Sequence, residues 1–333
     1  MIGWYVHGQG RGHLQRLECV AAHLRTPVSA FSCLPRPAGW TGGWTDLPDD
    51  LPTGADRDVT AGGTLHWAPA HHDGLRTRMA AVAAWVAAAS PALVVVDVSV
   101  EVAVLVRSMG VPVVVAAMRG DRTDRAHTTA YDLAEALLAP WPATRPEPWP
   151  SAWLDKTWHV GALSRFDGRR PVPPPGERRV AVLWGRGGSD VGATDVADAV
   201  AATPTWQWDT SGFAGEGSAA PGTADAWSLL QGADVVVTHG GQNALAEVAA
   251  ARRAAVVLPQ ARPHDEQRAN ARALAGLALV RERWPAPSQW TGVLEAARTQ
   301  DASQWTGWSD GQGAQRAAEA LDALAARYPR PAP

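Results

Sequence analysis

The sequence predicts an α/β protein with two domains, each a parallel β-sheet wrapped by helices. Short apolar runs alternate along the chain with longer Ala-rich stretches of helical period. This alternation is typical of parallel sheets covered by helices. The chain has 333 residues, which is comfortable for two such domains, and its apolar fraction of 46% lets each domain bury its own core.

Five strands and three helices are expected in the first half of the chain. The expected strands are residues 2–6, 28–33, 93–98, 111–116 and 136–139, and the expected helices are residues 14–24, 75–89 and 101–109. Residues 93–96 are apolar at every position, which indicates a strand buried on both faces. We expect residues 1–160 to form the N-terminal domain.

A segment rich in Pro, Arg and Gly separates the two halves. Prolines occupy positions 171, 173, 174 and 175, which is typical of a semi-rigid linker. We therefore place an interdomain linker at residues 161–178 and a second domain at residues 179–333. Its expected strands are residues 180–184, 235–238 and 255–258.

Composition limits the partners and the compartment. The formal net charge of −3 gives no reason to expect nucleic acid as a partner, because nucleic-acid-binding proteins usually carry a strong basic excess. Cys19 and Cys33 are too few for a disulfide framework, so we expect reduced thiols in a cytoplasmic protein. No stretch approaches the ~20 apolar residues of a membrane-spanning helix, and the first residues do not have the regions of a signal peptide.

The first expected strand ends in a glycine-rich turn, His7-Gly8-Gln9-Gly10-Arg11-Gly12-His13, that leads straight into the first helix. Glycines at this place let the backbone approach a ligand, and the helix N-terminus favours anions. The acidic residue that a dinucleotide site requires about 20 residues later is missing. The turn therefore argues against NAD as the ligand.

His13 and Asp97 are the candidate catalytic residues. In an open parallel sheet, ligands bind in the crevice outside the carboxyl ends of the strands. His13 follows the first strand, and Asp97 lies at the end of another strand of the same sheet. An imidazole can act as a general base when a carboxylate orients it. Each residue also has a structural alternative, His13 as a surface or capping residue and Asp97 as a turn or helix cap.

The most specific pattern lies at residues 238–271, THGGQNALAEVAAARRAAVVLPQARPHDEQRANA. A buried strand leads into a glycine turn and then into a helix, on which Asn243 and Glu247 share one face. A carboxylate at Glu247 suits the two adjacent hydroxyls of a ribose. Polar groups at residues 264–267 could bond sugar hydroxyls. The pattern therefore indicates a nucleotide-sugar site.

At these residues the sequence resembles the nucleotide-sugar glycosyltransferases with the GT-B fold. It looks closest to family 28, which includes the N-acetylglucosaminyltransferase of peptidoglycan synthesis; UDP-glucuronosyltransferases and antibiotic glycosyltransferases are more distantly similar. The shared pattern is His-Gly-Gly-x-Asn, a Glu four residues later, a strand that ends in Pro, and an acidic residue followed by Gln and by Asn-Ala. The resemblance implies the GT-B architecture, two Rossmann-like domains facing a cleft.

The resemblance also implies which residues bind the donor. The diphosphate region would be bound by His239, Gly240, Gly241 and Asn243. Glu247 would bind the ribose, and Glu266 and Gln267 would contact the transferred sugar. Gly187, Gly188 and Ser189 belong to a turn that resembles the second glycine-rich loop of the family, which lies against the donor phosphates. Gly12 and His13 resemble the N-terminal G-x-G-H loop, which holds the acceptor-activating histidine in many relatives.

The expected function is transfer of a sugar, with inversion, from a nucleotide-diphosphate donor such as a UDP-sugar to an acceptor hydroxyl. The acceptor would be a small molecule or a lipid-linked one, and the second case would bring peripheral membrane contact. The nucleotide sugar is a substrate, so no cofactor is expected. No Asp-x-Asp motif stands at an expected strand end, and the pair His71-His72 has no partners at metal-ligand spacing. We therefore expect no catalytic metal.

Two other functions would share the donor site. The N-terminal turn continues to Arg16 as G-x-G-H-x-x-R and lacks the proline that many transferases carry shortly after the histidine. This form also resembles nucleotide-sugar hydrolases of the same fold, so a hydrolase or epimerase would differ only in what His13 activates. A non-catalytic subunit that binds a nucleotide sugar is the third alternative.

Overall fold

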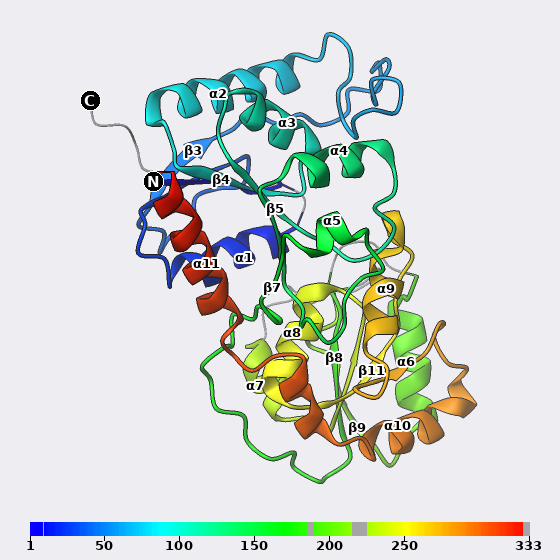
Figure 1. Ribbon diagram of the computed structural model, residues 1–333. Helices are drawn as coiled ribbons and strands as arrows, with labels where there is room; N and C mark the ends of the chain where they lie inside the picture. The colour runs from blue at the N-terminus through cyan, green and yellow to red at the C-terminus, as the bar shows by residue number, and fades with distance from the viewer. Residues whose placement is uncertain (9, 186–189, 215–224, 329–333) are drawn as a thin grey trace.

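Two parallel β-sheets with helices packed on their faces form the protein, which confirms the expected α/β class (Figure 1). The computed structural model describes residues 1–8, 10–185, 190–214 and 225–328. One sheet belongs to the first half of the chain and the other to the second half.

The first sheet has seven strands in the order β3-β2-β1-β4-β5-β6-β7. They are β1 (Ile2–Tyr5), β2 (Val28–Ser32), β3 (Gly43–Asp46), β4 (Leu93–Asp97), β5 (Val113–Ala116), β6 (Ala136–Ala139) and β7 (Thr157–His159). Strand β1 pairs in parallel with both β2 and β4. The strand order therefore reverses between β1 and β4, and the segments that follow these two strands diverge and leave a crevice between them.

The helices of this half are α1 (Gly12–Ala21), α2 (Asp73–Ala89), α3 (Val100–Ser108), α4 (Arg125–Leu133) and the short α5 (Ser151–Leu154). Polar residues just before three of them cap their first turns, because each side chain accepts a hydrogen bond from a free backbone N–H group. The capping residues are His72 for α2, Ser99 for α3 and Asp124 for α4.

The second sheet has five strands in the order β12-β11-β10-β8-β9. They are β8 (Arg179–Leu183), β9 (Gln207–Asp209), β10 (Val235–Thr238), β11 (Ala254–Val257) and β12 (Leu279–Val280). Here the order reverses between β8 and β10, which makes the turns after these strands the expected ligand site. The helices are α6 (Ala193–Ala202), α7 (Ala226–Gln231), α8 (Gln242–Ala251), α9 (Glu266–Ala273) and α10 (Trp290–Arg298), with 3₁₀ turns η1 (Pro263–Asp265), η2 (Pro287–Gln289) and η3 (Ala302–Gly307).

The last helix, α11 (Gly313–Arg327), returns to the first half and lies beside α1 (Figure 1). Its buried residues Ala317 and Leu321 share one apolar core with Ile2 and Leu17. This helix falls inside residues 179–333, the range expected for the second domain. No helix or strand lies between β7 and β8, where the linker was expected at residues 161–178.

Candidate functional site

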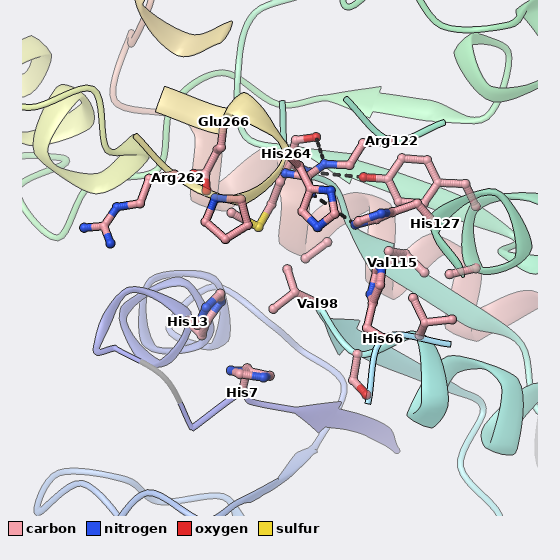
Figure 2. Close-up of a pocket in the computed structure, with 17 residues that line it drawn as sticks. His7, His13, His66, Val98, Val115, Arg122, His127, Arg262, His264 and Glu266 are labelled. Atoms are coloured by element: carbon pink, nitrogen blue, oxygen red, sulfur yellow. Dashed lines mark hydrogen bonds between the residues drawn. The ribbon is translucent and has the colours of Figure 1, made fainter. Parts of the chain in front are cut away.

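A cavity of about 370 Å³ lies between the two halves. From the first half, His7, His13 and Val98 line it; from the second half, Arg262, His264 and Glu266 line it (Figure 2). The cavity therefore opens beside the carboxyl ends of β1 and β4, where the order of the first sheet reverses.

The side chains of His13 and Asp97 are in direct contact with each other. The His13 Nδ1 lies 2.8 Å from the Asp97 Oδ1, and the Asp97 side chain is fully buried. A carboxylate can only accept a hydrogen bond, so the His13 Nδ1–H donates, and in the neutral form of the ring the Nε2 has a free lone pair. This is the arrangement of a general base whose tautomer is fixed by a carboxylate.

Arg16 is a second partner of Asp97, and the sequence pattern assigned it no such role. Its Nη1 donates to the same Asp97 Oδ1 at 2.5 Å, and its Nη2 donates to the Gln242 Oε1 at 2.8 Å, at the start of α8. Burial alone would raise the pKa of Asp97, but Arg16 and His13 beside it lower that pKa below its ordinary value. Asp97 therefore stays ionised, and Arg16 joins it to the second half of the protein. The signal in the sequence was the spacing of His13 and Arg16, three residues apart on one helix.

Two further residues at the ends of β1 and β4 shape the cavity. The ring of His7 lies 5.6 Å from the ring of His13, and burial followed by the nearby His13 lowers the pKa of His7 to about 4. His7 is therefore uncharged at neutral pH. Val98, directly after Asp97, has a φ of 62°. A β-branched residue rarely adopts this conformation, which costs about 1–3 kcal/mol and is found most often at functional sites.

The N-terminal turn contacts helix α8 of the second half. A Cβ atom placed on Gly12 would lie only 2.9 Å from the Asn243 Nδ2, so a glycine is required for this close approach. Gln15 lies within 3.5 Å of both Asn243 and Glu247 through its side-chain amide. Asn243 lies in the first turn of α8, beside its free N–H groups.

Glu247 is buried on the face of α8 that carries Asn243. Its Oε1 lies 2.9 Å from the Nε of Arg165, which belongs to the segment between the two sheets. Burial raises the pKa of Glu247, and the Arg165 charge opposes this effect. The structure thus places Glu247 at the cleft with a cationic partner that the sequence did not reveal.

The turn after β10 holds His239 in one tautomer. The Gly241 N–H donates to the His239 Nδ1 at 2.9 Å, so the Nε2 carries the proton. A Cβ on Gly185, at the end of β8, would lie 3.4 Å from that Nε2. Burial, followed by the charge of Arg262, lowers the pKa of His239 to about 4. His239 is therefore a neutral hydrogen-bond donor beside Gly185, and not a source of positive charge.

Three of the expected phosphate-binding residues, Gly187, Gly188 and Ser189, lie outside the described residues. Gly185, which begins the same turn, is described and lies beside His239.

Gln267 is buried and supports the glycine turn. Its Oε1 accepts hydrogen bonds from the N–H groups of Gly240, at 3.0 Å, and Gln260, at 2.9 Å. Asn270 holds the same turn by donating to the Gly240 carbonyl at 2.9 Å. The contact of Gln267 with the transferred sugar stays a prediction. Glu266 lines the cavity together with His13, and burial raises its pKa.

The fold also gathers four residues that no sequence spacing connected. His66, Asp124, His127 and His264 offer ligand atoms that all lie within 4.8 Å of one another. The three histidines of this cluster line the cavity together with His7 and His13 (Figure 2). They come from three segments that are far apart in the sequence, so no spacing between histidines predicted the cluster.

The comparisons with known proteins agree with this geometry. Residues 221–281 match the glycosyltransferase family 28 C-terminal domain. Among proteins of curated function, no match to the chain was found.

Solved structures match nearly the whole chain. The glycotransferase of kitacinnamycin is 18% identical with a TM-score of 0.67, and the match covers 97% of this chain and 98% of that one. UGT2 of Phytolacca americana, complexed with UDP-2-fluoro-glucose and pterostilbene, is 17% identical with a TM-score of 0.66 and 98% coverage of both chains. MurG of Acinetobacter baumannii is 15% identical with a TM-score of 0.59, covering 98% of this chain and 99% of that one.

The chain therefore has the GT-B fold of these solved glycosyltransferases. The residues that match the glycosyltransferase family 28 C-terminal domain lie in its second half. The helices in the described part of the chain include none that is long and apolar enough to cross a membrane.

Proposed function

We propose that this protein transfers a sugar, with inversion, from a nucleoside-diphosphate donor to an acceptor hydroxyl. One observation carries the proposal: His13 lines the cavity and is bonded to Asp97, and Arg16 joins Asp97 to α8, a helix of the matched family domain. A proton acceptor on one side of the cleft therefore faces a nucleotide-sugar pattern on the other side.

In the proposed mechanism, the His13 Nε2 takes the proton of the acceptor hydroxyl while its oxygen attacks the anomeric carbon. Asp97 stabilises the imidazolium that forms, because its carboxylate is ionised and bonded to the Nδ1–H. The bond from the anomeric carbon to the phosphate oxygen breaks as the new bond forms on the opposite face. The configuration of the sugar is therefore inverted.

The leaving nucleoside diphosphate gains negative charge, and the second half offers donors for it. The start of α8, with Asn243, lies beside Gly12 of the first half, and the helix dipole favours an anion at this end. The neutral His239 adds its Nε2–H. Preorganised donors of this kind stabilise developing charge without a metal ion. We propose Glu247 as the ligand of the ribose hydroxyls.

Acceptor dependence tests this proposal. Purified protein is incubated with a panel of UDP- and dTDP-sugars, with and without acceptor alcohols, and the release of nucleoside diphosphate is measured. A transferase releases it only when an acceptor is present. Steady release of free sugar without an acceptor would identify water as the acceptor and a hydrolase as the function. A donor that binds in a thermal-shift assay and never turns over would indicate a binding subunit.

The acceptor in this proposal is a small molecule or a lipid-linked alcohol, the latter with peripheral membrane contact. We place the reaction in the cytoplasm, which is supported by the two free cysteines, Cys19 and Cys33.

Turnover is expected to survive EDTA. The diphosphate charge in the proposed mechanism is met by the N-terminus of α8 and by hydrogen bonds from the glycine turns, so no divalent ion is required. The measurement is the initial rate after chelation and desalting, compared with the rate of the untreated protein. Complete loss of the rate, restored by Mg²⁺ or Zn²⁺, would contradict metal independence.

A further inference from the structure

We infer that His66, Asp124 and His264 form a binding site for one divalent transition-metal ion, with His127 as a positioning residue. This inference does not rest on the proposed function, and the proposed transfer reaction does not use the ion. It rests on the convergence of two imidazoles and a carboxylate from both halves of the protein, with a third imidazole that orients the carboxylate.

The distances between the ligand atoms are close to those of a metal site, and small side-chain movements would complete it. The His66 Nε2 lies 3.1 Å from the Asp124 Oδ1, and the His264 Nδ1 lies 3.7 Å from the Asp124 Oδ2. Ligands at about 2.0–2.2 Å from a tetrahedral zinc ion are about 3.4 Å apart. The contact between His264 and Asp124 is too long for a hydrogen bond, so hydrogen bonding to Asp124 does not explain why the His264 ring lies there.

His127 is expected to orient the carboxylate and not to bind the ion. Arg122 donates from its Nη1 to the His127 Nε2 at 3.1 Å, so the proton of this ring is on Nδ1. That Nδ1–H donates to the Asp124 Oδ2. Binding of a metal at Nδ1 would move the proton to Nε2, where it would face the Arg122 N–H. His127 instead resembles the outer partners that hold a metal-binding carboxylate in place.

The backbone holds His264 in this position. The Asp121 N–H donates to the His264 carbonyl at 2.8 Å, although the two residues belong to different halves. A Cβ on Gly120 would lie only 2.2 Å from the same carbonyl, so the close approach requires glycine. Since Asp124 and His66 belong to the first half and His264 to the second, a bound ion would join the two halves.

The chemistry of the ligands selects the kind of ion. Imidazole nitrogens suit zinc, cobalt, nickel and iron, whereas Mg²⁺ and Ca²⁺ prefer sites made of oxygen ligands. The four side chains are between 13% and 38% exposed, and the three histidines line the cavity, so an ion can reach the cluster from solvent.

Calorimetric titration of the EDTA-treated, desalted protein with Zn²⁺ tests the site. We expect one ion per chain, and a visible d–d absorption of low-symmetry Co²⁺ when cobalt replaces zinc. His66→Gln and His264→Gln should each weaken binding at least about 100-fold, since loss of an outer partner alone costs about 10–100-fold. His127→Gln should weaken it by about tenfold. His23→Ala, which removes an exposed histidine at the end of α1, is the matched control and should bind as wild type.

Zinc should also raise the temperature midpoint of unfolding of the wild-type protein and not that of His264→Gln. A bound ion stabilises the folded state, and the variant lacks one of the ligands that bind it. The two glutamine variants alter opposite halves of the protein, so a folding defect in one leaves the other informative. The inference is overturned if the stripped wild-type protein binds no Zn²⁺. It is equally overturned if both variants bind Zn²⁺ with wild-type affinity, which would leave only an ordinary hydrogen-bonded cluster.

Discussion

His13→Ala should reduce turnover by about 10²–10⁴-fold, the usual contribution of a general base. The His13 Nε2 is the only nitrogen of that ring left free by Asp97, and the ring lies at the cavity wall. The variant keeps the donor residues of α8, so nucleotide affinity should stay near that of the wild type. The measurements are kcat at saturating acceptor and the dissociation constant of the nucleoside diphosphate.

Two further variants separate catalysis from folding in this experiment. His23→Ala removes an exposed histidine at the other end of α1 and should retain the wild-type rate. Asp97→Asn should lower kcat in the same direction but less than His13→Ala, since the imidazole remains and loses only its ionised partner. Wild-type turnover in His13→Ala at saturating acceptor would exclude His13 as the base.

Glu247→Ala should weaken donor binding by about 1.5–3 kcal/mol, the typical contribution of hydrogen bonds to a charged group. Glu247 shares a face of α8 with Asn243, and Gln15 of the first half contacts both, so its carboxylate would be available at the cleft when a ribose displaces Arg165. Titration calorimetry with the nucleoside diphosphate measures the loss, and circular dichroism shows whether the fold is retained.

Arg165→Ala is the matched control for Glu247. It removes the half-exposed cation of the same ion pair and leaves the Glu247 carboxylate in place. Donor binding should then be unchanged or slightly tighter. An equal loss in both variants would mean that the ion pair, and not contact with the ribose, supports donor binding. Unchanged affinity in Glu247→Ala would remove Glu247 from the site.

The interior of each sheet could be predicted from the sequence, and its edges could not. Strands β1, β4 and β10 are buried on both faces and are therefore apolar at nearly every position. The four strands that were not expected, β3, β7, β9 and β12, lie at the four edges of the two sheets. They are two to four residues long and mostly half-buried or exposed, so their composition resembles that of a loop.

The candidate site, too, could be predicted from the sequence only in part. The donor pattern is contiguous in sequence, because one strand, one turn and one helix supply it, and its spacing was visible. The contact of His13 with Asp97 followed from the rule that ligands bind where strand order reverses. Arg165 and the cluster around Asp124 could not be predicted, because their partners are brought together only when the two halves pack.

The return of α11 to the first half means that the chain passes between the halves twice, and the two passages are bonded to each other. The Ala162 N–H donates to the Trp308 carbonyl at 3.1 Å, and the Arg316 Nε donates to the Val160 carbonyl at 2.9 Å. Two adjacent connections act as a hinge with a single axis, about which the halves can swing while twisting is resisted. Each opening of the cleft would then return His13 to the same place opposite α8, which would keep the proposed base in register with the proposed donor site through successive cycles.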